Sequence, residues 1–244
     1  MASPVTRKPL DPAEAAKFTA EAEALKALAR KHAAEAEKLE SEARSASLQA
    51  RAHEIELSIA ERLNEEELAK NSYFHIYSFT SPVSEGSVKS CMTELQTWSR
   101  LSPGCPIEVI FTSPGGDVIA GFALFDFLKS LQRPSGDRPA HTVTTTALGM
   151  AASMAGILLQ AGGTRVMTKE SWLMIHEASF GAHGKIGEVE DTVEWVKRVQ
   201  LRILDIFAER SKLSKATIAR KWKRKDWWLS SDQALAAGFI DEIR

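Results

Sequence analysis

The first third of the chain has the pattern of a long exposed helix. From Ala13 to about Lys70 there is neither glycine nor proline, and Ala, Glu, Lys, Leu and Arg, the residues of high helix propensity, dominate. Asp11 suits the N-cap and Pro12 suits the first turn. A continuous helix of this length would extend about 85–90 Å. The pattern therefore predicts an extended helix or a helical hairpin.

The apolar positions of this segment are sparse and keep only an approximate heptad: Leu25, Leu28, Leu39, Leu48, Ile55, Ile59 and Leu63. Two interpretations stay open. The segment either finds a partner through weak coiled-coil contacts, or it is a solvated helix without a specific partner. Residues 1–71 are treated as a helical, coiled-coil-like N-terminal arm.

From about Tyr73 short apolar runs alternate with amphipathic stretches. These patterns predict strands at 73–79, 106–112, 142–147, 165–168 and 171–176, and helices at 86–101, 118–131, 154–161, about 187–210, 215–222 and 231–237. Repeated β-then-α units favour parallel strands with right-handed crossovers. We therefore expect one α/β domain over residues 72–244.

One serine stands out in this domain. Ser153 lies in the small, apolar run 149–156, between a predicted buried strand and a predicted helix. A helix N-terminus offers unpaired N–H groups and positive partial charge, which suits a nucleophile whose substrate develops an oxyanion. The alternative is that Ser153 is a helix cap or a small packing residue.

Two further residues would complete a catalytic triad. His176 follows a predicted apolar strand, and Asp226 lies within the run Lys221-Trp-Lys-Arg-Lys-Asp-Trp-Trp-Leu229. A serine hydroxyl needs a neutral imidazole to take its proton, and a carboxylate orients that imidazole. Taken singly, His176 is equally compatible with a structural histidine. The run around Asp226 is typical of a solvated basic helix end, and a small nucleic-acid patch is a second alternative that one cluster on a near-neutral protein supports only weakly.

A glycine pair follows another predicted strand. Ser113-Pro114-Gly115-Gly116 lets the backbone approach a ligand closely and present N–H groups to it. With the N–H of Met154, that of Gly116 would form an oxyanion hole. A phosphate-binding role is disfavoured because no G-x-G-x-x-G or GKS/T pattern accompanies these glycines.

Composition limits the kinds of partner and cofactor that we expect for this protein. The net charge of −1 creates no overall attraction to nucleic acid or to an anionic membrane. The two cysteines match no metal motif and are expected to be reduced thiols. Residues 1–10 lack the apolar run of a secretory signal, and no segment has the roughly 20 apolar residues of a membrane span. We expect a cytoplasmic protein without metal or organic cofactor.

Four blocks of the sequence resemble the Clp protease proteolytic subunit, in the family's order and at similar spacing. They are Phe111–Phe122, Gly149–Met154, Met174–His176 and Leu229–Asp241. The resemblance covers roughly residues 72–244 and implies an α/β fold of the crotonase-like ββα superhelix type, preceded here by the helical arm. It also implies Ser153 as nucleophile, His176 as general base, Asp226 as third member, and Gly116 and Met154 as oxyanion-hole donors.

The resemblance further implies an assembly. Members form homo-oligomeric rings, usually of seven subunits and often doubled, and Gly181–Gly187 with the following helix resembles the handle through which two rings stack. The implied substrates are polypeptides. An ATP-dependent AAA+ unfoldase is an implied partner, since this chain has no nucleotide-binding motif of its own.

Departures from the family pattern bear on function. Glu177-Ala178 stands where the family usually has proline two residues after the histidine, Thr112 replaces a common asparagine, and basic residues precede Asp226. The long arm replaces a short segment that lines the family's axial pore. It is similar to the arms of bacteriophage members, which suggests a capsid-maturation protease that acts on capsid proteins without an unfoldase. The rival from another class is a non-catalytic ring used as a scaffold.

Overall fold

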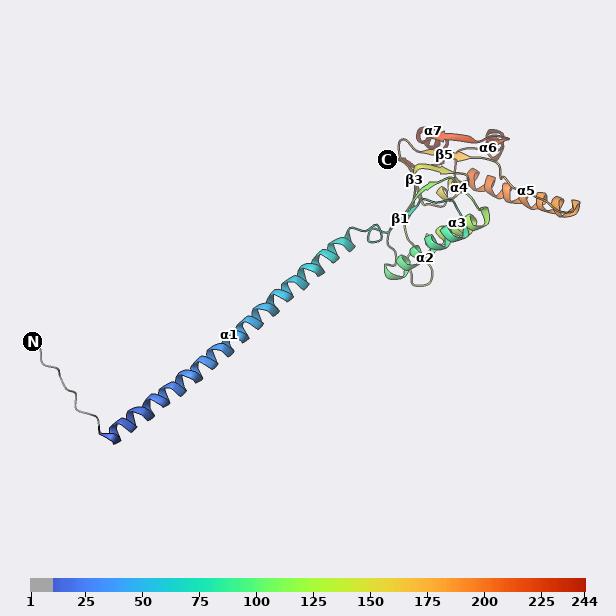
Figure 1. Cartoon of the computed structure of the whole chain (residues 1–244). Helices are drawn as coiled ribbons and strands as arrows, with labels where there is room; N and C mark the ends of the chain where they lie inside the picture. The colour runs from blue at the N-terminus through green and yellow to red at the C-terminus, as the bar shows by residue number, and fades with distance from the viewer. Residues whose placement is uncertain (1–10) are drawn as a thin grey trace, which may run out of the picture. The chain divides into compact units, whose positions relative to one another are not determined.

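The N-terminal arm is a single helix. The computed structural model describes residues 11–244, and α1 spans Pro12–Leu68, 57 residues in all (Figure 1). The Asp11 carbonyl accepts the Ala15 N–H at 2.9 Å, and the Asp11 carboxylate accepts the Ala13 N–H at 3.3 Å. Asp11 therefore caps the helix as predicted. The alternative prediction of a helical hairpin is wrong, because α1 is uninterrupted.

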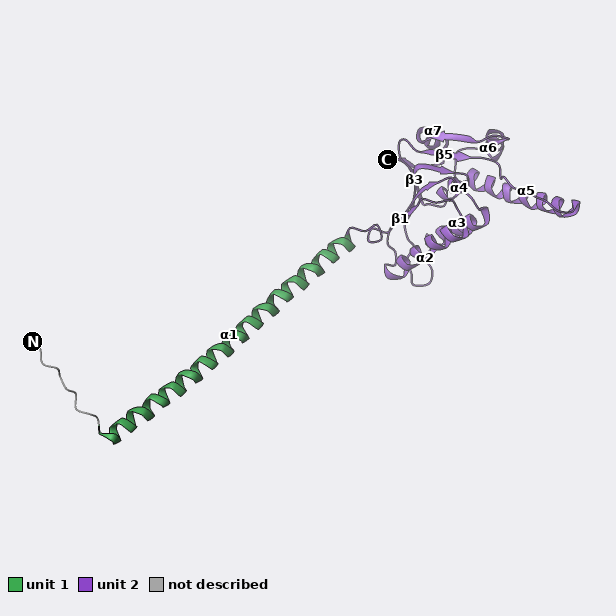
Figure 2. Cartoon of the chain, viewed as in Figure 1, with its two compact units in different colours: residues 1–68 green, residues 69–244 purple. Residues whose placement is uncertain are grey.

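Two compact units divide the chain, one ending at Leu68 and the other running from Ala69 to Arg244 (Figure 2). No residue of α1 is buried. Its coiled-coil partner thus stays a prediction. The predicted absence of a secretory signal concerns residues 1–10, which lie outside the described residues.

The second unit is an α/β structure around one seven-stranded sheet. Its strands are β1 (Ile76–Phe79), β2 (Ile107–Ser113), β3 (Val143–Ala152), β4 (Thr164–Met167), β5 (Trp172–Ile175), β6 (Trp227–Ser230) and β7 (Glu242–Ile243). Its helices are α2 (Glu85–Leu101), α3 (Val118–Leu131), α4 (Met154–Leu159), α5 (Ile186–Glu209), α6 (Lys215–Trp222) and α7 (Ser231–Ala237). The mixed α/β class is confirmed, and the bounds of α3, α6 and α7 match the prediction.

Neighbouring strands are parallel, as expected from the β-then-α pattern, with one exception. The order β1-β2-β3-β4-β7 is parallel throughout, and β5 pairs with β3 in parallel and with β6 in antiparallel fashion. The prediction of parallel strands is therefore wrong for the pair β5–β6. Strands β6 and β7 are absent from the sequence prediction. The interpretation of 221–229 as a basic helix end is wrong beyond Trp222, where α6 ends.

β3 changes partners along its length. Thr144–Ala147 pair with β4, and Met150–Ala152 pair with β5. Between the two stretches lies Gly149, at φ 74°, a conformation that costs glycine little. The strand consequently runs five residues further than predicted and delivers its last residue beside β5.

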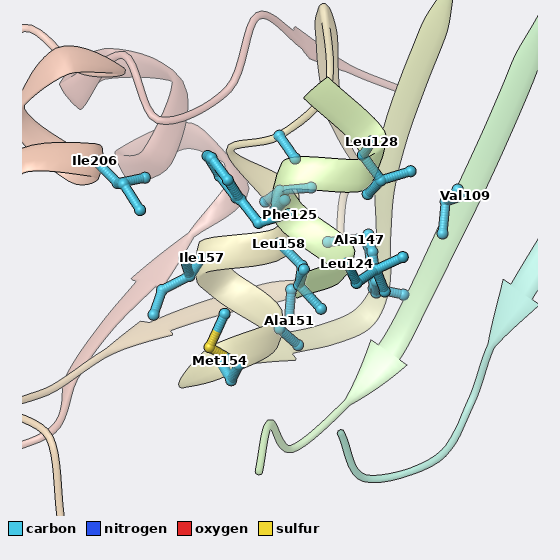
Figure 3. Close-up of a cluster of buried hydrophobic side chains, with 14 of the residues drawn as sticks. Val109, Leu124, Phe125, Leu128, Ala147, Ala151, Met154, Ile157, Leu158 and Ile206 are labelled. Atoms are coloured by element: carbon cyan, nitrogen blue, oxygen red, sulfur yellow. The ribbon is translucent and has the colours of Figure 1, made fainter. Parts of the chain in front are cut away.

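The core beneath this junction holds α4 in place. Figure 3 shows the Met154 side chain turned into a cluster with apolar side chains of α3, α4 and β3. Met154 is only 1% exposed, and a Cβ on Gly121 would lie 2.4 Å from its Cγ. Glycine at 121 thus allows Met154 to enter the core. The residue that follows Ser153 is thereby anchored.

Candidate active site

Ser153 occupies the turn between β3 and α4. Its φ of 54° and ψ of −122° form a conformation that is strained for a residue with a side chain. The Ser153 N–H donates to the Met174 carbonyl at 2.9 Å, which extends the β3–β5 ladder by one residue. The Ser153 side chain makes no capping hydrogen bond to α4. Ser153 therefore occupies the N-cap position of α4, but its hydroxyl does not cap the helix and is available for another partner.

That partner is His176. The His176 Nε2 and the Ser153 Oγ lie 2.7 Å apart, within hydrogen-bond distance. β5 ends at Ile175, so His176 is the first residue beyond the strand that pairs with the end of β3. The parallel pairing of β3 and β5 thus brings together two residues that are 23 positions apart.

Asp226 comes to the other side of the imidazole through β6. Ile175 pairs with Trp227 in the antiparallel β5–β6 ladder, so His176 stands opposite Asp226. The His176 Nδ1 lies 3.5 Å from the Asp226 Oδ1, and the Asp226 side chain is 56% exposed. The carboxylate is close enough to favour an N–H at Nδ1, which leaves Nε2 free to accept the serine proton.

The glycine pair lies directly against this serine. A Cβ on Gly115 would be 2.6 Å from the Ala152 carbonyl oxygen, 2.7 Å from the Met154 nitrogen and 2.7 Å from the Ser153 Cβ. A Cβ on Gly116 would be 2.3 Å from the Val83 carbonyl oxygen. Both glycines have positive φ, 90° and 148°. Close approach and backbone conformation therefore both require glycine at these two positions.

Two backbone N–H groups remain free beside Ser153. Val83 bonds to the backbone on either side of Gly116, to the Gly115 carbonyl and the Asp117 N–H, so the Gly116 N–H is not used in that bridge. Met154 is the first residue of α4, where an N–H has no acceptor within the helix. Among the described residues no side chain accepts from either group. Both groups can therefore stabilise an oxyanion.

A small hollow opens beside these groups. Its volume is about 50 Å³. Ser153, His176 and several apolar side chains of the core line it. The lining is Gly116, Val118, Ser153, Met154, Ile157, Ile175, His176, Ala178, Ser179, Ile203 and Phe207. Most of these side chains are apolar, so the hollow suits part of an uncharged side chain.

A second serine–histidine pair lies elsewhere in the same unit. The Ser99 Oγ and the His141 Nε2 are 2.9 Å apart, and the His141 Nδ1 is 3.0 Å from the Cys105 carbonyl oxygen. No described carboxylate contacts His141, and no pair of free N–H groups accompanies Ser99. His141 itself is buried. The Ser99–His141 pair thus has the spacing of a nucleophile and a base, but it lacks an orienting carboxylate among the described residues.

Other candidate chemistry is weak. Burial raises the pKa of the Cys91 thiol to about 12, which keeps it protonated and unreactive. Within residues 11–244 no group of three or more His, Cys, Asp or Glu side chains could hold a metal ion. None of the described helices combines the length and apolarity needed to cross a membrane.

One contact at the site could not be predicted from the sequence. The Glu177 carboxylate accepts the Arg224 backbone N–H at 2.8 Å, just beyond the end of the antiparallel β5–β6 ladder. Arg224 has a φ of 58°. In the sequence, Glu177 stands out only as a departure from a family pattern. The partner of its carboxylate depends on the backbone conformation at Arg224, which no local motif predicts.

Comparison with known proteins bears on the second unit. The sequence model of the Clp protease family matches residues 65–244. The ATP-dependent Clp protease proteolytic subunit 1 of Chlamydia muridarum is 33% identical over 169 residues, which cover 68% of this chain and 83% of that protein. The ATP-dependent Clp protease proteolytic subunit of Deinococcus radiodurans is 30% identical over 165 residues, covering 67% of this chain and 76% of that protein.

Proposed function

Since the chain belongs to the Clp protease family and has its fold, we propose that it is a serine endopeptidase that hydrolyses peptide bonds through an acyl-enzyme on Ser153. The observation that carries this proposal is the 2.7 Å contact between the His176 Nε2 and a serine held in a strained turn. Strain of this kind persists where the surrounding structure enforces it, and it concentrates at functional sites.

The chemistry follows from the arrangement. The Ser153 Oγ attacks the carbonyl carbon of the scissile bond while His176 takes its proton at Nε2. The Gly116 and Met154 N–H groups donate to the oxyanion of the tetrahedral intermediate. His176 then gives its proton to the leaving amine, and water repeats the sequence to release the acyl group. Asp226 stabilises the imidazolium through Nδ1.

The substrates in this proposal are polypeptides, with an uncharged residue beside the scissile bond because the hollow is mostly apolar. The working unit is a homo-oligomeric ring, a heptamer or a double heptamer, in the cytoplasm. The Gly181–Gly187 segment and α5 would stack two rings. An AAA+ unfoldase would supply any ATP-driven step, because this chain carries no nucleotide-binding motif. No metal or organic cofactor takes part.

A second candidate rests on α1. All 57 of its residues lie outside any buried core, and large apolar side chains such as Phe18, Leu25 and Leu39 are exposed on it. Such a helix favours a role in which the arm recruits a partner, as in a capsid-maturation protease working without an unfoldase, or in a Clp-like scaffold without catalysis.

The proposal is tested by labelling the assembled protein with a fluorophosphonate and measuring the mass of the intact assembly. We expect one label per reactive subunit, peptide hydrolysis by the unlabelled protein, and loss of both in Ser153→Ala. Ser99→Ala is the matched control, because it removes the other histidine-bonded serine. Labelling that survives Ser153→Ala and disappears in Ser99→Ala would sink the proposal. An assembled ring that takes no label would favour the scaffold.

A further inference from the structure

The loop that presents Asp226 has few attachments of its own. Among the described residues, the Asp226 carboxylate contacts only His176, at 3.5 Å, and more than half of that side chain is exposed. Asp226 also precedes β6, so the β5–β6 ladder does not yet hold it. Whatever fixes residues 223–226 therefore determines where this carboxylate lies relative to the imidazole.

One side chain from the segment that follows β5 fixes the loop. The Glu177 carboxylate accepts the Arg224 N–H at 2.8 Å. Among the described residues, the loop backbone has one other hydrogen bond of its own, a local one from the Lys225 N–H to the Trp222 carbonyl at 3.1 Å. Apart from the His176–Asp226 contact, Glu177 thus supplies the one described link between the loop and the segment that carries His176.

The position of this link matters for the catalytic pair. β5 and β6 stop exchanging backbone bonds at Ile175 and Trp227. Beyond that point the Glu177 carboxylate takes the place of a backbone acceptor. It thereby connects the segment after β5 to the loop before β6. His176 directly precedes Glu177, and Asp226 lies two residues after Arg224. The link therefore spans the same gap as the His176–Asp226 contact, on its outer side.

The backbone at Arg224 makes the link more than incidental. A φ of 58° is uncommon for a residue with a side chain, because the side chain crowds the following carbonyl oxygen there. A charged acceptor forms a stronger hydrogen bond than a neutral one, and so it can offset the cost of this crowding. Without the acceptor, the loop is free to leave the left-handed conformation, and Asp226 would move with it.

We infer that Glu177 is a positioning residue, which holds Asp226 against His176 by anchoring the backbone at Arg224. This inference rests on the proposed function, because it assigns Asp226 a role in the reaction. Glu177 contacts none of the reacting atoms. Its effect passes through the loop, and a displacement of about 1 Å in such a group can cost up to about 100-fold in rate.

The test compares Glu177→Ala with Glu177→Gln. The glutamine amide oxygen still accepts an N–H, whereas alanine cannot. We expect kcat for a short peptide to fall about 10- to 100-fold in Glu177→Ala with little change in KM, and to recover largely in Glu177→Gln. Glu170→Ala, which removes an exposed carboxylate ahead of β5, is the matched control and should leave kcat unchanged.

A double-mutant cycle shows whether Glu177 acts through Asp226. In an Asp226→Ala background, Glu177→Ala should cause almost no further loss, because the carboxylate that it positions is gone. Losses that multiply in the double variant, or a Glu177→Ala enzyme with the kcat of the original protein, would overturn the inference.

A measurement independent of activity separates this inference from the proposed function. Hydrogen exchange at the Arg224 amide should be slow in the original protein and in Glu177→Gln, and faster in Glu177→Ala. If exchange follows this order but the original protein hydrolyses no peptide and takes no label, the link is real and the proposed function is wrong. If exchange at Arg224 is equally fast in all three, the link is wrong whatever the activity.

Discussion

Gly115 lies so close to Ser153 that a Cβ on residue 115 would be 2.7 Å from the Ser153 Cβ. The turn after β2 is therefore packed against the turn after β3 with no room for a side chain. This contact sets the distance between the two turns through backbone packing, and Gly116 and Ser153 line the same hollow.

Gly115→Ala should accordingly lower the free energy of unfolding by about 3 kcal/mol and abolish peptide hydrolysis, since the new methyl group meets backbone atoms that cannot move independently. Gly136→Ala is the control, because Gly136 also has positive φ, 58°, but a Cβ there meets nothing within 4 Å. Its cost should be only the backbone strain, about 1 kcal/mol. Equal effects of the two substitutions in urea unfolding would contradict the packing argument.

Asp226→Asn should lower kcat by about 10³- to 10⁴-fold with KM nearly unchanged, because an amide neither favours the reactive tautomer nor stabilises the imidazolium. Steady-state hydrolysis of a fluorogenic peptide measures both constants. A fall of less than tenfold would mean that the 3.5 Å contact with His176 has no part in the reaction.

Asp241 should make stability depend on pH. Burial alone raises the pKa of this carboxyl, but the hydrogen bonds from Arg165 and the charges of Arg165 and Arg210 outweigh burial and hold the pKa below its ordinary value. A depressed pKa stabilises the fold above the ordinary value, near 3.8, and this contribution is lost as the pH falls through the lower, folded-state value.

Asp241→Asn should therefore cost about 2 kcal/mol at pH 7, since it leaves the buried Arg165 without its ionic partner. The difference from the original protein should shrink as the pH falls below about 4. Asp232→Asn, which removes an exposed pair with Lys169, should leave stability almost unchanged because solvent screens such a pair. Urea unfolding at several pH values checks both. A cost for Asp241→Asn that does not change with pH would count against the ionic explanation.

Removing residues 1–68 should leave the second unit folded, because no residue of α1 is buried. The thermal midpoint of the shortened chain should lie within about 2 °C of the full chain, measured by calorimetry. Hydrolysis of a short peptide should be unchanged. A large drop in the midpoint would show that the arm contributes to the packed core.

The positions of four candidate site residues at the ends of strands or helices could be predicted from the sequence, because strand-to-helix turns and glycine pairs have local signatures. They are Gly116, Ser153, Met154 and His176. Ser153 and Met154 stand at a strand-to-helix turn whose small neighbours are visible in the chain. Residue chemistry made Ser153, His176 and Asp226 candidates for a triad, and the family resemblance then implied the role of each. Whether these residues catalyse a reaction stays a prediction that the variants above decide.

The strand that brings Asp226 to His176 could not be predicted in the same way. Trp227 and Trp228 follow a run of basic residues, and this combination is typical of the end of an amphipathic helix. Only the pairing of Ile175 with Trp227 makes residues 227–230 a strand, and that pairing depends on a segment some fifty residues earlier in the chain. The Glu177 link was missed for the same reason.

The antiparallel pair β5–β6 also has a consequence for folding during synthesis of the chain. A ribosome adds residues from the N-terminus, so Ser153 and His176 leave it well before Asp226 and β6. The arrangement of all three side chains therefore awaits the final stretch of synthesis. Under the proposed function, an unfinished chain would therefore hold Ser153 and His176 without Asp226 until the last part of the domain is made.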